Sequence, residues 1–378
     1  MTLITFDGFE TYGDGTEAGS EIEDRIDNTF EMRTVPTNPS FRPDTEDMTI
    51  VDDFETAGKA LRFPTPRTGR TLYVEYEYPS AYQVSSNASA PDMACGFRYY
   101  NPVRNPVASP TNTDIFHLLQ GSGSTLTQIQ LDSDYTSLTM NPDSGSSVTA
   151  TDVLTEGAWH YIEAEWKFCS AANGGYFKLY VDGVAVIDEA SVNVATATFW
   201  TSYGLSIGIA GGNETTPLDP DHRVMLDDVY VMELDGVDHT EVLGDVRAKL
   251  LSPTSDATPN DWGPSTGGNN YALVDERDWD ETDYVEGDVT ADDDHYGLDT
   301  LAGASVHGLR VDAVVKATDG TPTLHIGFDN GTADESNRGI IGTATTVMEV
   351  GIFPLDPSGS AWTVSSVNSV EATQRMTE

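Results

Sequence analysis

Two neighbouring stretches alternate apolar and polar residues and leave few folds open to the chain: GAWHYIEAEWKF (157–168) and YFKLYVDGVAV (176–186). Successive side chains of a β-strand point to opposite faces, so each stretch predicts a strand. In the second stretch, Asp182 and Gly183 supply the positive φ angles of a two-residue hairpin turn. The polar face of the first strand is expected in water, and its core face carries His160, Ile162, Ala164, Trp166 and Phe168.

Further strands follow the same pattern, and no segment of comparable strength predicts a helix. The stretch HRVMLDDVYVMEL changes its apolar parity between Leu226 and Val229, which predicts a β-bulge near Asp227 and Asp228. Gly, Ser, Thr and Asp fill the gaps between short apolar runs, a composition that favours all-β folds. The additional strands are expected at 60–64, 71–78, 93–100, 115–121, 127–132 and 203–211.

The chain predicts two β domains. After Leu234 it becomes loop-rich, so we place a boundary near residue 238, giving domains 1–238 and 239–378. The second domain is smaller, and a short helical turn is expected in VSSVNSVEA near its end. Its strands are expected at 306–317, 323–329 and 346–354.

The charge balance is extreme, with 62 acidic against 19 basic residues and a formal net charge of −43. Such self-repulsion weakens a compact state unless salt screens it, so a halophilic host is expected. An ordinary acidic secreted or virion protein is the alternative. Phosphate contacts with nucleic acid depend on clustered Lys and Arg, so nucleic acid is not an expected partner.

Neither a signal peptide nor a run of about 18 apolar residues is visible in the sequence, so membrane insertion is not expected. Cys95 and Cys169 are predicted to be small buried residues, with a disulfide between them left open. No His or Cys spacing suits a transition metal.

The order of motifs resembles a known family. FDGFETYG (6–13), GKALRF (58–63), the two alternating stretches and VMLDDVYVME (224–233) together resemble the concanavalin A-like, laminin G-like jelly-roll modules of virion proteins from tailed phages and archaeal tailed viruses. The resemblance covers roughly residues 1–235. LGDVRAKLLSPTSD, DWGPSTGGNNYALVDE and the closing FPLDPSGSAWTVSSVNSVEA resemble the second half of such proteins.

The resemblance implies a virion structural protein assembled in the host cytoplasm: a turret, decoration or tail-fibre subunit. It would form a homo-oligomer, a trimer or a pentamer, beside other capsid or tail proteins, and contact host-surface glycan. A free lectin-like adhesin of the host is disfavoured by the missing export signal.

Jelly rolls of this kind also carry glycoside hydrolases, which use acids that alternate along one strand. Glu163 and Glu165 form such a pair, about 7 Å apart along a strand, but the third acid of the signature is missing. We therefore expect a solvated acidic face and no enzyme. A polysaccharide depolymerase that uses this pair is the alternative.

Lectin-like jelly rolls often hold calcium through carboxylates in loops, and two loop clusters qualify here by type. Sugar recognition commonly uses aromatic platforms on loops. The calcium candidates are Asp219, Asp221, Asp292 and Asp294, and the ligand-binding candidates are Trp262, Tyr271, Trp200 and Tyr203.

Overall fold

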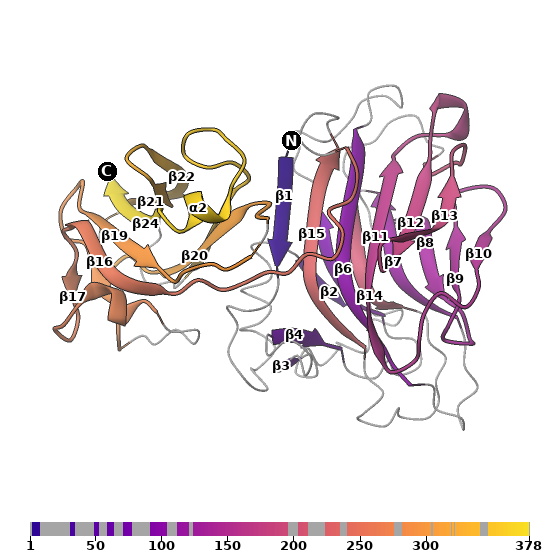
Figure 1. Cartoon of the computed structure of the whole chain (residues 1–378), viewed down its shortest axis with the longest axis horizontal. Coiled ribbons are helices and arrows are strands. Elements are labelled where there is room, and N and C mark those ends of the chain that lie inside the picture. The colour runs from indigo at the N-terminus through magenta and orange to yellow at the C-terminus, as the bar shows by residue number, and fades with distance from the viewer. Residues whose placement is uncertain are drawn as a thin grey trace. The chain divides into compact units, whose positions relative to one another are not determined.

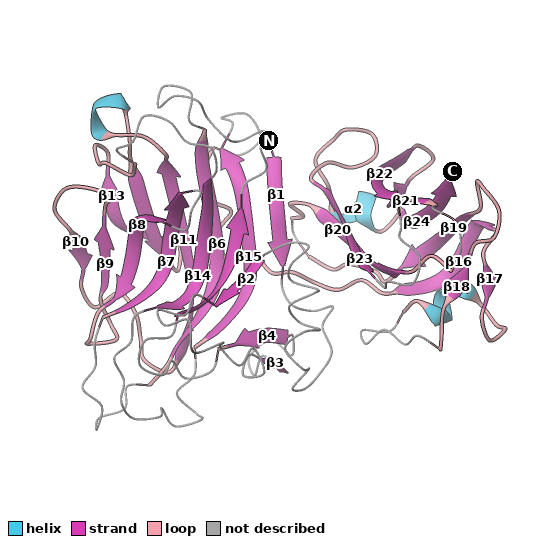
Figure 2. Cartoon of the chain, turned by 180° about the vertical axis from the view of Figure 1, so that it is seen from behind, coloured by secondary structure: helices cyan, strands magenta, loops and turns pink. Residues whose placement is uncertain are grey.

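The structure is a computed structural model that describes residues 2–7, 31–34, 49–52, 59–63, 71–77, 91–103, 112–120, 124–195, 203–210, 224–234, 240–275, 282–303, 305–318, 320, 322–340 and 347–377. Almost all of the secondary structure is β, which confirms the predicted all-β class (Figure 2). No helix in the described ranges has the length and apolar character needed to cross a membrane.

The described residues form two compact units, one ending at Ala248 and the other beginning at Lys249. The change of unit thus lies beyond the boundary expected near residue 238. The reason is that Val242, Leu243 and Val246 pack against a hydrophobic cluster of the first unit. In the sequence they belong to the loop-rich stretch after Leu234, so this packing was not visible there.

The first unit contains two antiparallel sheets (Figure 1). The strands of sheet A are β1 (Thr2–Asp7), β3 (Thr49–Asp52), β4 (Lys59–Arg62), β6 (Asp92–Asn101), β11 (Ala158–Lys167), β12 (Phe177–Val181), β13 (Val184–Glu189) and β15 (Met225–Leu234). The strands of sheet B are β2 (Glu31–Thr34), β5 (Thr71–Glu77), β7 (Thr113–Gln120), β8 (Ser124–Leu131), β9 (Leu138–Asn141), β10 (Val148–Ala150) and β14 (Tyr203–Ala210). Sheet A runs β13-β12-β11-β6-β15-β4-β3 with β1 beside β15, and sheet B runs β10-β9-β8-β7-β14-β5-β2.

Rings from the two sheets meet in the core of this sandwich. Phe116 of β7 lies 5.8 Å from Trp166 of β11 and 6.4 Å from Phe97 of β6, measured between ring centroids. Burying a side chain of the size of Phe contributes about 1.5–3 kcal/mol, so these rings hold the sheets together. Both cysteines, Cys95 and Cys169, are buried and free.

The predicted hairpin and bulge are confirmed. Asp182 and Gly183 adopt φ angles of 50° and 75° between β12 and β13. The pairing of β15 with β6 shifts between Asp227 and Tyr230, and Asp228 has a φ of 49°. All the strands expected in the first half are present.

The second unit is the smaller β-sandwich that the sequence predicts. Sheet C runs β16-β19-β24-β21-β22, and the β20–β23 pair packs over it through Phe328, Phe353 and Trp362. The expected helical turn is α2 (Val364–Val367), capped by Thr363. The strands of this unit are β16 (Pro253–Asn260), β17 (Gly263–Pro264), β18 (Val285–Glu286), β19 (Asp293–Leu298), β20 (Leu309–Val315), β21 (Thr323–Asp329), β22 (Ala333–Ile340), β23 (Val347–Phe353) and β24 (Glu371–Thr377).

Candidate functional site

The acid pair lies on the outer face of sheet A, the face turned away from sheet B. Register places Glu163 opposite Gly96 of β6 and Tyr180 of β12, and places Glu165 opposite Lys178. We expected this face in water. Instead Glu163 is 0% exposed and Glu165 is 3% exposed, so the prediction of a solvated acidic face is wrong.

Residues 242–248, called the linking segment below, cover the pair. The amide of Gly244 donates to Glu163 Oε1 over 2.8 Å, and that of Val242 donates to Glu165 Oε1 over 3.3 Å. The amide of Leu243 donates to the hydroxyl oxygen of Tyr230 over 3.1 Å. Side chains of sheet A thus accept hydrogen bonds from three successive amides of the segment.

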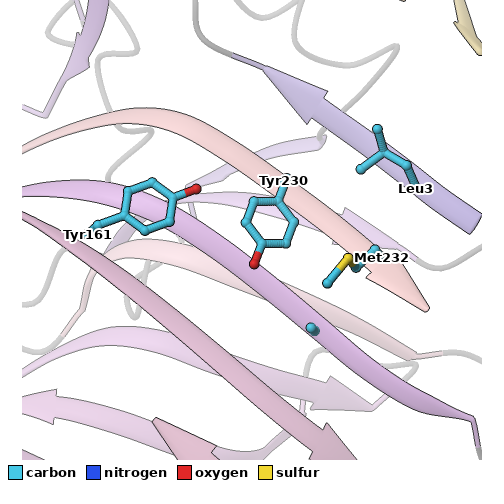
Figure 3. Close-up of a cluster of buried hydrophobic side chains, with 5 residues drawn as sticks. Leu3, Tyr161, Tyr230 and Met232 are labelled. Carbon is cyan, nitrogen blue, oxygen red and sulfur yellow. The ribbon is translucent and has the colours of Figure 1, made fainter. Parts of the chain in front are cut away.

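An apolar cluster completes the cover (Figure 3). Its buried members are Leu3 of β1, Ala94 of β6, Tyr161 of β11, and Tyr230 and Met232 of β15. Val242, Leu243 and Val246 of the linking segment pack against it. The segment is therefore held by burial as well as by hydrogen bonds.

Gly96 makes room for the tyrosine of this cluster. A Cβ atom at Gly96 would lie 2.3 Å from Cε1 of Tyr230, far inside van der Waals contact. The hydroxyl of Tyr230 can then reach Glu163 Oε1 at 2.7 Å. The absence of a side chain on β6 is what allows the tyrosine to lie against the acid.

Burial raises the pKa of the Glu163 carboxyl, and the hydrogen bonds from Tyr230 and Gly244 lower it in part. Glu165 differs, because Lys178 Nζ lies 3.0 Å from its Oε2 and the Tyr180 hydroxyl donates to its Oε1 over 3.2 Å. A carboxyl with a raised pKa beside a tyrosine is suited to proton transfer. In this structure, however, both acids anchor the linking segment.

The same face continues into an aromatic and cationic patch. The Arg98 guanidinium lies 4.7 Å from the centroid of the Trp159 ring, and Nη1 of Arg98 lies 3.9 Å from Oδ2 of Asp227. Tyr100 meets Trp159 edge to face. Trp159, Trp166 and Trp362 are all buried. The sequence showed no sign that Arg98 joins them.

A histidine–carboxylate pair lies beside the hairpin turn. Nδ1 of His160 is 2.7 Å from Oδ2 of Asp182, and the amide of Thr155 donates to Nε2 of His160. Since Nε2 accepts a hydrogen bond, the ring proton is on Nδ1 and is donated to Asp182. Both ring nitrogens are engaged within the chain, so this pair fixes the turn.

Three of the candidate residues come together in the second unit. Oδ1 of Asp294 accepts from the Trp262 amide over 2.8 Å, and Oδ2 accepts from the side chains of Asn270 and Tyr296 over 2.7 and 2.8 Å. The Tyr271 amide, one residue along from Asn270, donates to Asp256. Trp262 and Tyr271 therefore lie beside Asp294 and Asp256 in a partly buried polar network, which they join through their backbone amides.

The remaining candidates are dispersed. Oδ2 of Asp292 accepts from the amides of Asp288 and Val289, so it closes a turn. Trp200, Asp219 and Asp221 lie outside the described residues, and only the backbone of Tyr203, in β14, is described. Within the described ranges, no group of three or more His, Cys, Asp or Glu residues is placed to hold a metal ion. Calcium binding stays a prediction.

No family model matches the chain, and no curated protein matches it. Among solved structures it is similar to an endo-β-1,4-glucuronan lyase from the fungus Trichoderma reesei, with 16% identity and a TM-score of 0.39 over 61% of this chain and 95% of that chain. An endo-1,3-β-glucanase from Streptomyces sioyaensis has 13% identity and a TM-score of 0.39 over 61% and 95%. An alginate lyase has 12% identity and a TM-score of 0.36 over 60% and 95%.

All three TM-scores are below 0.5 and all three identities are below 25%, so the jelly-roll-like sandwich rests on the chain's own two sheets. The three neighbours are two lyases and a glucanase, which runs against the expectation that the chain is not an enzyme, and that expectation is dropped.

Proposed function

We propose that the chain is a surface protein of a tailed virus particle with a halophilic host, and that it recognises carbohydrate of the host envelope. The observation that carries the proposal is the locked linking segment. Glu163, Glu165 and Tyr230 bind its amides, so the chain leaves the first unit from a fixed place. A subunit that holds a receptor-binding part on a particle benefits from such a connection.

Two properties of the sequence support the particle and its host. The order of motifs resembles virion jelly-roll proteins through both halves of the chain. The net charge of −43 suits a surface that stays hydrated while salt screens its long-range repulsion. The proposed partners are further copies of this chain, as a trimer or a pentamer, and capsid or tail proteins.

Light scattering of the purified protein tests the assembly. We expect a closed trimer or pentamer in about 2 M salt that loosens in about 0.05 M salt, because the Debye length grows from about 3 Å at 1 M to about 10 Å at 0.1 M. A monomer at every salt concentration would count against the particle.

A second candidate function is cleavage of a surface polysaccharide, with Glu163 as the proton-transferring group. The raised pKa of Glu163 and its 2.7 Å contact with Tyr230 favour this chemistry. The linking segment covers both, so a sugar chain would reach them only after the segment is displaced.

Product analysis tests the second candidate. The wild-type protein is incubated with host polysaccharide, and reducing ends and unsaturated sugars are measured. Glu163→Gln and Glu165→Gln proteins serve as comparisons once circular dichroism shows that they fold. Activity that both variants keep would exclude this pair as the catalytic acids, and wild-type protein that releases no product would remove the candidate.

A further inference from the structure

One aromatic side chain of the second unit is presented to solvent. Tyr284 is 46% exposed, and it is the only aromatic residue among the strongly exposed large hydrophobic residues of the described ranges. Trp262, the residue of this region that the sequence favoured for sugar binding, is instead only partly exposed and packs on the cluster of Ala317, Leu324 and Ile326. The exposed platform is therefore Tyr284.

The backbone amide and the backbone carbonyl of Tyr284 are both hydrogen-bonded to Ser265. The amide of Ser265 donates to the Tyr284 carbonyl over 2.9 Å, and the Tyr284 amide donates to Oγ of Ser265 over 3.0 Å. Immediately beyond this pair, β17 and β18 form a two-stranded ladder, with Gly263 opposite Glu286. Residues 263–269 and 283–286 are called the Tyr284 ribbon below. Both labelled strands are visible in Figure 2.

The base of the ribbon is fixed by the buried network of Asp294. At one end the Trp262 amide donates to Asp294, and at the other Asn270 Nδ2 donates to both the Trp262 carbonyl and Asp294. The residue after β18, Gly287, packs closely against Trp262: a Cβ atom at Gly287 would lie 2.8 Å from the Trp262 ring. These contacts restrain the base of the ribbon without any ligand, which lowers the entropic cost of binding.

The exposed part between these anchors is Ser-Thr-Gly-Gly-Asn, residues 265–269. Tyr, Ser, Gly and Asn are the residue types that recognition loops use, because the ring supplies rigid contact area and the small polar groups supply adaptable hydrogen bonds. A tyrosine face suits the C–H face of a pyranose, and neighbouring hydroxyl and amide groups suit its hydroxyls.

Charge selects among sugars. Residues 251–303 contain one basic residue, Arg277, among many Asp and Glu residues, and Asp261, Glu286 and Asp288 are exposed around the ribbon. A uronate polymer would meet this excess of carboxylates, while a neutral sugar offers hydroxyl donors to the same carboxylates. The local chemistry therefore favours a neutral glycan.

We propose that the Tyr284 ribbon is a binding site for neutral oligosaccharide, with Tyr284 as the stacking platform. The proposal rests on the carbohydrate recognition proposed above and names the site and the class of ligand. It places the sugar on the second unit, whereas the acid pair belongs to the first.

Ligand-observed NMR with the full chain in about 2 M salt tests the site. The probes are neutral gluco-, manno- and galacto-hexasaccharides and an oligo-uronate of equal length. At least one neutral probe binds the wild-type protein, and Tyr284→Ala weakens that binding by about tenfold, a factor within reach of one lost ring contact. Tyr284→Phe keeps the ring and most of the affinity. Val314→Ser, at an exposed apolar position of β20, leaves binding unchanged.

The outcomes separate this site from the function. Neutral binding that Tyr284→Ala does not weaken overturns the site and leaves carbohydrate recognition standing. A wild-type protein that binds only the oligo-uronate overturns the ligand class. A protein that binds no probe overturns both proposals.

Discussion

At the scale of single residues, Glu163 shows how a buried carboxylate can hold a chain segment at a cost to its own ionisation. Its Oε1 accepts from Tyr230 and Gly244, while Lys178 pairs with the neighbouring Glu165. Burial nevertheless raises the pKa of Glu163, because desolvation penalises the charged form more than these hydrogen bonds favour it. The acid acts chiefly as a hydrogen-bond acceptor for the linking segment.

Removing that acceptor should destabilise the first unit. We expect Glu163→Ala to lower the free energy of unfolding by about 2–4 kcal/mol, because the Tyr230 hydroxyl and the Gly244 amide lose their partner and a cavity forms. Glu163→Gln keeps an acceptor oxygen and should change it by less than about 1 kcal/mol. Urea unfolding at pH 7 in concentrated salt measures both. Equal losses in the two variants would mean that the charge itself holds the segment.

The pH dependence of the same pair follows from the sign of the shift. The folded state holds the Glu163 proton more tightly than the unfolded state does, so wild-type stability gains as the pH falls through the raised pKa. The Gln variant lacks that proton. Hence the stability of wild type relative to Glu163→Gln should rise from pH 7 to pH 4.5, as measured by paired unfolding curves. A constant difference would contradict the raised pKa.

The second buried carboxylate, Asp294, should be less tolerant of an amide. All three of its described partners donate to it, from Trp262, Asn270 and Tyr296. In Asp294→Asn the new NH₂ group would face a donor, which we expect to cost about 2–4 kcal/mol. Tyr296→Phe, which removes one of the three bonds, should cost about 1 kcal/mol. Hydrogen exchange of the Trp262 amide reports the loss locally.

At the scale of elements, the sequence predicts those strands and turns that are determined by residues close together in the chain. The alternation in β11 and the Asp-Gly turn after β12 identify strands and a hairpin without knowledge of their partners. The cover over Glu163 could not be read in this way, because Gly244 lies 81 residues further along the chain. Likewise PTSDATPN reads as a loop, yet it forms β16 by pairing with β19. The residue types of Trp262, Tyr271 and Asp294 suggested sites, but only the fold joins them.

The bulge of β15 offers a test at this scale. Asp228 has a φ of 49°, and its Oδ1 accepts from the Ala248 amide over 2.7 Å at the end of the linking segment. Asp228→Val should lower the free energy of unfolding by about 2–4 kcal/mol, since a β-branched residue is strained at positive φ and cannot accept the hydrogen bond. Asp228→Asn tolerates this φ and keeps the acceptor. Thermal unfolding that affects both variants equally would show that the charge, not the bulge geometry, matters.

At the scale of the whole molecule, the chain carries 62 acidic and only 19 basic residues. This excess of negative charge sets the salt concentration at which both units are stable. We expect the unfolding temperature to fall steadily as salt is lowered from about 2 M to about 0.05 M, because repulsion between carboxylates is then screened over a longer distance. Sucrose at equal water activity is the control: it is excluded from protein surfaces but does not screen charge. If NaCl restores the unfolding temperature and sucrose does not, charge screening is the cause. Equal recovery with sucrose would show that solute exclusion stabilises the fold, and the acidic surface would then need another explanation than a salt-rich medium.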